Sequence, residues 1–143
     1  MKIMVLNGPN LNMVGIREKE IYGDRSFDGL ISYINEEAYK RNVEVDCRQS
    51  NHEGDLVDWI QEAYFEKFDG IIINPGAYTH TSIAIADAIK AIAPIPVIEV
   101  HISDISTREE FRRISYIAPY CVDQIKGHGF EGYIMALDEL LKK

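Results

Sequence analysis

The chain has 143 residues, of which 46% are hydrophobic, and a formal net charge of -8 at pH 7. This length supports one domain with a substantial core, and the acidic balance excludes a nucleic-acid-binding face, which needs Lys and Arg to neutralise phosphates. No apolar run approaches the roughly 18 to 20 residues of a membrane helix, and no signal-like leader opens the chain, so we expect a soluble, cytoplasmic protein with no membrane partner.

Apolar runs and helical patterns alternate regularly along the chain. The predicted strands cover residues 2–7, 43–48, 70–74, 95–101 and 120–126. The predicted helices cover residues 27–41, 53–67, 80–93 and 130–142, with a short helical turn at 108–114. This alternation predicts a five-stranded parallel sheet with helices on both faces, and we expect one flavodoxin-like three-layer α/β sandwich over residues 1–143. Cys47 and Cys121 fall in the second and fifth strands and are interpreted as core residues, because their spacing fits neither a metal site nor a disulfide framework.

One predicted helix is apolar on nearly every side. Within residues 83–93, only Asp87 and Lys90 interrupt a surface of isoleucine and alanine. A sheet can cover only one side of such a helix, and the remaining apolar side needs another partner. We therefore expect a homo-oligomer in which this helix contacts a second copy of the chain.

Three predicted strands end in polar residues. The three junctions are Asn7-Gly8-Pro9-Asn10, Asn74-Pro75-Gly76 and His101-Ile102-Ser103. In a parallel sheet such ends lie along one edge, and open α/β sheets bind ligands at this edge. The sequence therefore predicts one cleft in which amide side chains and an imidazole face a small, oxygen-rich molecule.

The connection between the first strand and the first helix is long for a βα loop, and such loops are usually functional or disordered. Gly15 and Gly23 stand at its ends, with Arg17 and Tyr22 between them. A guanidinium about 4 Å from a phenol favours the phenolate by about 4 kcal/mol at an effective dielectric constant of about 20, more than the roughly 2.7 kcal/mol of a two-unit pKa shift. Arg17 and Tyr22 can thus form a general base in a closing lid. The alternative is a tyrosine packed under a surface loop with Arg17 paired to a neighbouring glutamate, and this segment alone favours that alternative.

Glu99 and His101 lie two residues apart on a strand, so their side chains point to the same face. A carboxylate there can hold the imidazole in one tautomer and favour its charged form, which makes His101 a candidate general acid. The alternative is a paired structural histidine at a strand end. The position of His101 beside the other two polar junctions favours the catalytic interpretation.

The third predicted helix and the strand before it supply binding candidates. Asn74 ends that strand, and His80 lies beside the N-terminus of the helix, whose amides are predicted to bind an anion. Thr79 or Thr81 would cap the helix, which explains their hydroxyl groups without any chemistry.

Arg108 and Arg112 are spaced by four residues, so they are predicted to share one face of the short helical turn. Glu109 and Glu110 can neutralise them as surface pairs, which is the more common outcome. The alternative is capture of a substrate carboxylate, for which the planar guanidinium is well suited.

Six motifs, in this order, closely resemble those of the type II 3-dehydroquinate dehydratases, and they span nearly the whole chain. They are Asn7-Gly8-Pro9-Asn10-Leu11-Asn12, Gly15-Ile16-Arg17-Glu18 with Ile21-Tyr22-Gly23, Arg48-Gln49-Ser50-Asn51-His52-Glu53-Gly54, Asn74-Pro75-Gly76-Ala77-Tyr78-Thr79-His80-Thr81-Ser82, Glu99-Val100-His101-Ile102-Ser103 and Arg108-Glu109-Glu110-Phe111-Arg112. The resemblance implies anti elimination of water from 3-dehydroquinate to give 3-dehydroshikimate, without cofactor or metal. It also implies assembly as a dodecamer, a tetramer of trimers. Lys19 departs from the proline that the family often carries in the lid, and residues 104–107 also differ from the usual pattern.

The resemblance also implies a role for each site residue. Tyr22 as phenolate would remove the proton next to the ketone, Arg17 would lower the pKa of Tyr22, and Asn10 would position a water that stabilises the enolate. His101, oriented by Glu99, would protonate the departing hydroxyl. The substrate carboxylate would bind to Asn74 and to the backbone amides of Ile102 and Ser103, and its hydroxyls would bind to His80 and Arg112. Asp87 would reach the site of a neighbouring subunit, and Arg108 would contact the closed lid.

There are two rival interpretations, one with another class of protein and one with another catalytic mechanism. A flavodoxin-like module that holds FMN or a phosphate would need a glycine- or hydroxyl-rich cradle after the first strand, and Asn-Gly-Pro-Asn is a poor one. A Schiff base between the substrate ketone and a lysine would use Lys126, which is placed near the end of the fifth strand.

Overall fold

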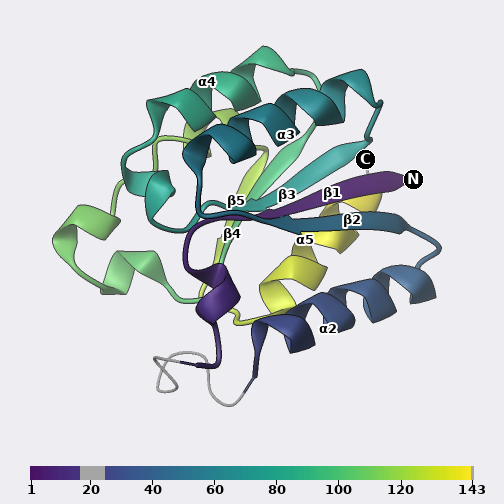
Figure 1. Cartoon of the computed structure of the whole chain (residues 1–143), viewed down its shortest axis with the longest axis horizontal. Coiled ribbons are helices and arrows are strands. Elements are labelled where there is room, and N and C mark those ends of the chain that lie inside the picture. Colours follow the sequence, from purple (N-terminus) through teal and green to yellow (C-terminus); the bar gives the residue numbers. More distant parts are fainter. Residues whose placement is uncertain (17–24, 143) are drawn as a thin grey trace.

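The computed structural model describes residues 1–16 and 25–142, and its strands form one parallel sheet (Figure 1). The strands are β1 (Lys2–Asn7), β2 (Glu44–Gln49), β3 (Gly70–Asn74), β4 (Val97–His101) and β5 (Asp123–Lys126). Their order across the sheet is β2-β1-β3-β4-β5, and all four neighbouring pairs run parallel. This is the flavodoxin-like order, which places a ligand crevice beside β1 and β3, where the winding of the sheet reverses.

The helices cover the sheet in two layers (Figure 1). α2 (Phe27–Lys40) and α5 (Glu131–Leu141) lie on one face, and α3 (Glu53–Phe65) and α4 (Ile83–Ala91) lie on the other. Together with the strand order, these layers confirm the predicted three-layer α/β sandwich. In the described part of the chain, no helix is both long enough and apolar enough to cross a membrane.

Alternate strand residues divide between two cores, because successive side chains of a strand point to opposite faces. Val5 of β1 and Ile72 of β3 pack in the core beneath α2 and α5. Met4 and Ile71, one position earlier on the same strands, pack in the core beneath α3 and α4. Burial on both faces makes these strands continuous apolar runs and holds their carboxyl ends in fixed positions.

The start of α4 differs from the prediction. Residues Gly76–His80 form a separate 3₁₀ helix, η2, and α4 begins only at Ile83. The side chain that caps α4 is Ser82, not Thr79 or Thr81 as predicted. The predicted helix started at residue 80, the last residue of η2, because a short 3₁₀ helix has no apolar periodicity that marks where it ends.

The start of β5 also differs from the prediction. Ala118–Tyr120 forms a 3₁₀ turn, and β5 begins at Asp123, so Cys121 lies before the strand and not within it. Cys47 lies in β2 as predicted. Both thiols are partly buried against the two cores, and burial raises the pKa of each to about 12.

Candidate active site

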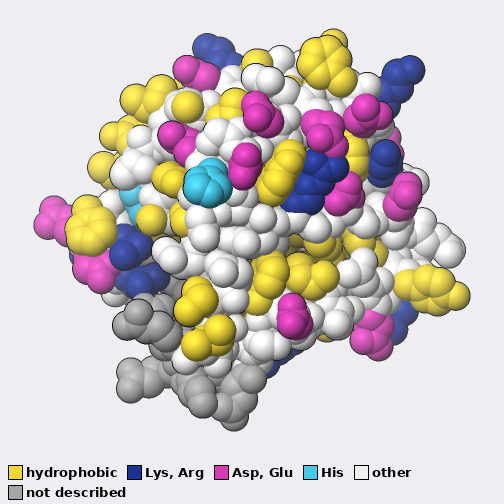
Figure 2. Space-filling model, viewed as in Figure 1, with side chains coloured by type: hydrophobic (Ala, Val, Ile, Leu, Met, Phe, Trp, Pro, Cys, Tyr) yellow, Lys and Arg dark blue, Asp and Glu magenta, His cyan; other side chains and the backbone are white. Residues whose placement is uncertain are grey.

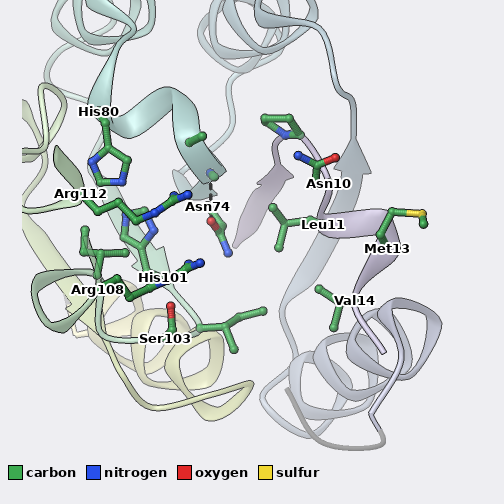
Figure 3. A pocket seen from close by; sticks show the side chains of 15 residues that line it. Asn10, Leu11, Met13, Val14, Asn74, His80, His101, Ser103, Arg108 and Arg112 are labelled. Carbon is green, nitrogen blue, oxygen red and sulfur yellow. Dashed lines mark hydrogen bonds between the residues drawn. The ribbon is translucent and has the colours of Figure 1, made fainter. Parts of the chain in front are cut away.

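A cavity of about 420 Å³ lies at the carboxyl ends of β1, β3 and β4 (Figure 3). All three predicted polar junctions contribute to its lining, with Asn10 after β1, Asn74 and His80 from the β3 junction, and His101 and Ser103 from the β4 junction. These side chains come from segments far apart in the sequence, and the sheet brings them to one place. A cavity of this size holds a small molecule.

The structure places most, but not all, of the predicted site residues at this cavity. Eight of them line it, namely Asn10, Asn74, His80, His101, Ile102, Ser103, Arg108 and Arg112. Glu99 lies behind His101, and Asp87 lies exposed on α4, away from the lining. Arg17, Tyr22 and the atypical Lys19 fall outside the described residues, so what was expected of them stays a prediction.

Glu99 and His101 form a buried carboxylate–imidazole pair. Glu99 is 0% exposed and His101 is 4% exposed, and Nε2 of His101 lies 2.5 Å from Oε2 of Glu99. Burial raises the pKa of Glu99, but hydrogen bonds from His101, Thr79 and Ser115 outweigh burial and hold this pKa below its ordinary value. Since a carboxylate only accepts hydrogen bonds, Nε2 of His101 donates to it. Nδ1 is therefore the ring nitrogen that can exchange a proton with a bound molecule.

Two hydroxyl groups for which the sequence predicted no role beside Glu99 complete the surroundings of this carboxylate. Thr79 Oγ1 donates to Glu99 Oε2 at 2.6 Å, and Ser115 Oγ lies 2.9 and 3.0 Å from the two carboxylate oxygens. Thr79 was predicted only as a cap, and Ser115 belongs to a segment with no regular element. No spacing rule connects either residue to Glu99, so only the folded path of the chain reveals them.

His80 is held in one tautomer by the backbone. Its Nδ1 lies 2.7 Å from the carbonyl oxygen of Ile114, which can only accept, so Nδ1 carries the proton and Nε2 is an acceptor. Burial lowers the pKa of His80, and the charges of His101 and Arg112 lower it further. A neutral His80 at neutral pH can accept a hydrogen bond from a hydroxyl group.

Arg108 and Arg112 both line the cavity, but they do not share a helical face as predicted. The expected turn at 108–114 is replaced by two 3₁₀ turns, Ile105–Thr107 and Glu110–Arg112, and Arg108 has extended backbone between them. Nε of Arg112 pairs with Glu109, which is the surface pair predicted as the more common outcome. Figure 3 shows both guanidinium groups among the cavity-lining side chains, where they provide positive charge in an acidic protein.

Asn10 is positioned by residues at the end of β2. Asn10 has a left-handed backbone with φ of 71°, which Asn tolerates better than most residues, and its N–H donates to Asn51 Oδ1 at 3.0 Å. Gln49 Nε2 donates to the same oxygen at 3.2 Å and to the Gly8 carbonyl at 3.1 Å. Gln49 and Asn51 were part of a recognised motif but had no predicted role, and the structure shows that they hold the Asn10 turn.

The predicted anion site at the N-terminus of α4 is not part of the cavity. Ser82, which caps this helix, also donates its hydroxyl hydrogen bond to the carboxylate of Glu53 on α3. A protein carboxylate therefore already lies at this helix end. The cavity is lined instead by Gly76, Ala77 and His80 of the preceding η2.

The structure offers little support for either of the two rival interpretations. Gly8 N donates to the Asn74 carbonyl and Leu11 N to the Gly8 carbonyl, so the turn after β1 uses these amides internally and not as a phosphate cradle. Lys126 pairs with His101 in the β4–β5 register but is not among the lining residues. Among the described residues, no three His, Cys, Asp or Glu side chains are grouped as metal ligands would be.

Fold and site together define an open-sheet α/β protein with a cavity and a buried carboxylate–imidazole pair at the carboxyl edge of its strands. The family model "Dehydroquinase class II" matches residues 1–141. A 3-dehydroquinate dehydratase of Clostridium perfringens is 60% identical over 143 residues, covering 100% of this chain and 99% of that protein. One of Clostridium beijerinckii is 58% identical over 144 residues, covering 100% of this chain and 98% of that protein.

Solved structures agree with the sequence comparison. The crystal structure of type II dehydroquinase from Butyrivibrio crossotus has a TM-score of 0.97 and 58% identity, covering 99% of this chain and 97% of that one. That of Propionibacterium acnes has a TM-score of 0.94 and 40% identity over the same shares of both chains. The chain belongs to the class II dehydroquinase family.

Proposed function

We propose that this protein eliminates water from 3-dehydroquinate to give 3-dehydroshikimate, with Tyr22 as base and His101 as acid. Membership of the family over almost the whole chain supports the reaction. The observation that carries the proposal is the buried Glu99–His101 pair beside a cavity lined with amides and arginines. Such a cavity suits a small carboxylate that also carries hydroxyl groups and a ketone.

His101 acts as the general acid. Its Nε2–H stays bound to Glu99, so the cationic ring can give its Nδ1 proton to the departing hydroxyl group, which leaves as water. The electrons of the enolate re-form the ketone and make the new C=C bond as the C–O bond breaks. Glu99 does not itself transfer a proton in this step, because it orients the ring and stabilises the imidazolium.

Tyr22 removes the proton next to the ketone, and Arg17 lowers the pKa of Tyr22. These roles rest on the resemblance of the motif around them, since both residues lie outside the described ranges. The flanking residues support the assignment: Phe27 N donates to the Val14 carbonyl at 3.2 Å, and Val14 lines the cavity. The chain before segment 17–24 therefore lines the cavity at Val14, and the chain after the segment is hydrogen-bonded to Val14.

The lining residues bind and orient the substrate. Asn74 and the backbone amides of Ile102 and Ser103 bind its carboxylate, and neutral His80 accepts a hydrogen bond from a hydroxyl group. Three further lining residues have roles of their own. Arg112 binds the substrate hydroxyls, Arg108 contacts the closing loop, and Asn10 positions the water that stabilises the enolate.

The protein assembles as a homo-oligomer, a dodecamer built from four trimers, in which Asp87 reaches the site of a neighbouring subunit. Ile83 on α4 is 60% exposed, and Phe111, Ile114 and Tyr120 of the segment after β4 are also exposed. Figure 2 shows hydrophobic side chains gathered at its upper left, over α4. Exposed apolar groups of this kind favour burial against another copy of the chain.

The test of the proposed function follows the product, a conjugated enone, by its ultraviolet absorbance after addition of 3-dehydroquinate. Wild-type protein should generate the signal, and Tyr22→Phe should lose nearly all turnover while substrate affinity stays broadly intact, because a base acts in the transition state. A Tyr22→Phe variant that keeps a tenth of the wild-type rate would place the base elsewhere. Borohydride added with the substrate should leave activity unchanged, whereas inactivation with added mass on Lys126 would indicate a Schiff base.

A further inference from the structure

A chain of hydrogen bonds runs from the last helix to the wall of the cavity. Tyr133 of α5 is 1% exposed, and its phenol oxygen accepts a hydrogen bond from Asn74 Nδ2 at 2.9 Å and donates one to Asn7 Oδ1 at 2.6 Å. At the other end of the same Asn74 amide, the backbone N–H of Gly76 donates to Oδ1 at 3.1 Å. Asn74 lines the cavity, whereas the proposed mechanism uses neither Tyr133 nor Asn7.

The direction of every bond in this chain follows from its first donor. A backbone N–H can only donate, so Gly76 requires the oxygen of the Asn74 amide on its side. The nitrogen of that amide then faces Tyr133 and donates to the phenol oxygen. Tyr133 has a single proton, and it gives this proton to Asn7. A reversed Asn74 amide would set two donors against each other at Gly76 and would break the bond there.

We infer that Tyr133 is a positioning residue that fixes the Asn74 side chain with an amide N–H available to the cavity. Nδ2 of Asn74 has two protons, and Tyr133 accepts one of them, so the other can reach a bound molecule. The ligand atom that Asn74 meets must then be an acceptor, such as a carboxylate oxygen. The inference rests on the proposed function only for the identity of that ligand.

Tyr133, which holds the Asn74 side chain, and Asn7, which holds Tyr133, are both buried. Asn7 and Asn74 are register partners on β1 and β3, and Asn7 is 0% exposed. Tyr133 packs in the core beneath α2 and α5. Figure 3 shows Asn74 amid the cavity-lining side chains, with its bond to the Gly76 backbone drawn as a dashed line. Anchors at both ends of the amide, Gly76 of η2 and Tyr133 of α5, restrict its rotation in the way that a preorganised binding group requires.

A double-mutant cycle tests whether Tyr133 acts through Asn74. Tyr133→Phe removes the hydroxyl and keeps the ring, and we expect kcat/KM for 3-dehydroquinate to fall about tenfold, mainly through KM. Asn74→Ala should lower kcat/KM further. In the double variant, the second change should add less than about twofold, because residues acting through one group are not independent. Effects that simply multiply would overturn the inference.

A change elsewhere on the same helix is the matched control. Leu137 is 1% exposed on α5, one turn after Tyr133. Leu137→Ala should lower thermal stability by creating a cavity, and any effect that it has on kcat/KM should multiply with that of Asn74→Ala. If Leu137→Ala showed the same lack of independence as Tyr133→Phe, the coupling would reflect general loosening of α5, and the inference would fail.

A second measurement needs no substrate. In an ¹⁵N-labelled protein, the side-chain NH₂ signals of Asn74 are identified by their loss in Asn74→Ala. Tyr133→Phe should shift these signals and speed their exchange with water, because one N–H loses its acceptor. Unchanged signals would overturn the inference. If the signals respond but wild-type protein does not convert 3-dehydroquinate, the proposed function fails and the positioning of Asn74 by Tyr133 stands.

Discussion

Glu99 has no solvent exposure, yet its pKa lies below the ordinary value for a glutamate. Burial alone works in the opposite direction, so the donors around the carboxylate decide the outcome. Thr79 Oγ1 and Ser115 Oγ provide two of these donors, and His101 provides the third. The charge of the carboxylate that holds His101 therefore depends on two hydroxyl groups that do not line the cavity.

Removal of one of these hydroxyl groups should make His101 less effective in its proposed role as general acid. Thr79→Val keeps the shape of the side chain and leaves Glu99 with one donor fewer, so we expect kcat to fall about tenfold, since a hydrogen bond to a charged group contributes about 1.5 to 3 kcal/mol. Thr79→Ser should retain most of the rate. Steady-state kinetics measure both, with Thr81→Val as the control at an exposed position. Equal rates for Thr79→Val and wild-type protein would show that the hydroxyl does not matter.

The lowered pKa of Glu99 also makes stability depend on pH. A carboxyl whose folded pKa lies below its unfolded value of about 4.5 stabilises the fold above that pH, and this contribution is lost as the pH falls through the folded pKa. The unfolding free energy of wild-type protein should therefore drop more steeply below about pH 4.5 than that of Glu99→Gln. Urea denaturation at one protein concentration over a pH series measures both slopes. Parallel slopes would mean that Glu99 binds its proton equally well in the folded and unfolded chains.

Residue patterns predicted the Glu99–His101 pair but missed the groups around it, and the reason is physical. Side chains two residues apart on a strand point to the same face, so the spacing of Glu99 and His101 was enough to predict the pair. Thr79 and Ser115 reach Glu99 from a 3₁₀ helix and an irregular segment, which are held together where Tyr116 N donates to the Thr79 carbonyl. Contacts of this kind depend on the whole fold and produce no regular spacing of residues in the sequence.

At the scale of the elements, buried strands and amphipathic helices were predicted to within a few residues, and the short 3₁₀ helices were not. β3 and β4 are buried at every position, and apart from Glu99 and the polar residues at their carboxyl ends they consist of apolar residues and glycine. Ile105–Thr107 and Glu110–Arg112 are separate 3₁₀ turns of three residues each, formed by local hydrogen bonds. The spacing of four residues between Arg108 and Arg112 therefore wrongly predicted that they share one helical face.

Close contact between the ends of β1 and β3 should tolerate no added side chain. A Cβ on Gly8 would lie 2.5 Å from the Pro75 carbonyl oxygen, and Gly8 N donates to the Asn74 carbonyl at 2.8 Å. Gly8→Ala must push these two backbone segments apart, so we expect a loss of about 1 to 3 kcal/mol in unfolding free energy. We also expect weaker substrate binding, because Asn10 and Asn74 sit on the separated segments. Chemical denaturation and KM measure the two effects.

Gly54 is the matched control for Gly8. It lies in the first turn of α3, and a Cβ there meets nothing within 4 Å. Gly54→Ala should raise stability by about 0.5 to 1 kcal/mol, because alanine loses less conformational freedom than glycine in a helix. Gly8→Ala protein as stable as wild type would show that the two strand ends can separate freely.

At the scale of the whole molecule, the net negative charge opposes binding of an anion, whereas arginines at the cavity favour it locally. The protein carries a formal net charge of -8, which disfavours an anionic ligand at long range. Arg108 and Arg112 line the cavity, and the donor end of Asn74 faces the same space in the arrangement inferred above. The net charge therefore does not decide the ligand class, which follows from a few groups in one cavity.

Asp87 allows the assembly to be tested through activity. It lies exposed on α4 and does not line the cavity of its own chain, so a role in catalysis requires a second copy. Asp87→Ala and His101→Ala should each be nearly inactive alone. Refolded together in equal amounts, they should recover activity in about one quarter of the sites, those that combine an intact His101 with an intact Asp87 from the neighbouring subunit. Sedimentation at micromolar concentration should show a species larger than a monomer in every sample. A mixed sample that stays inactive would show that Asp87 does not act at the site of a neighbouring subunit.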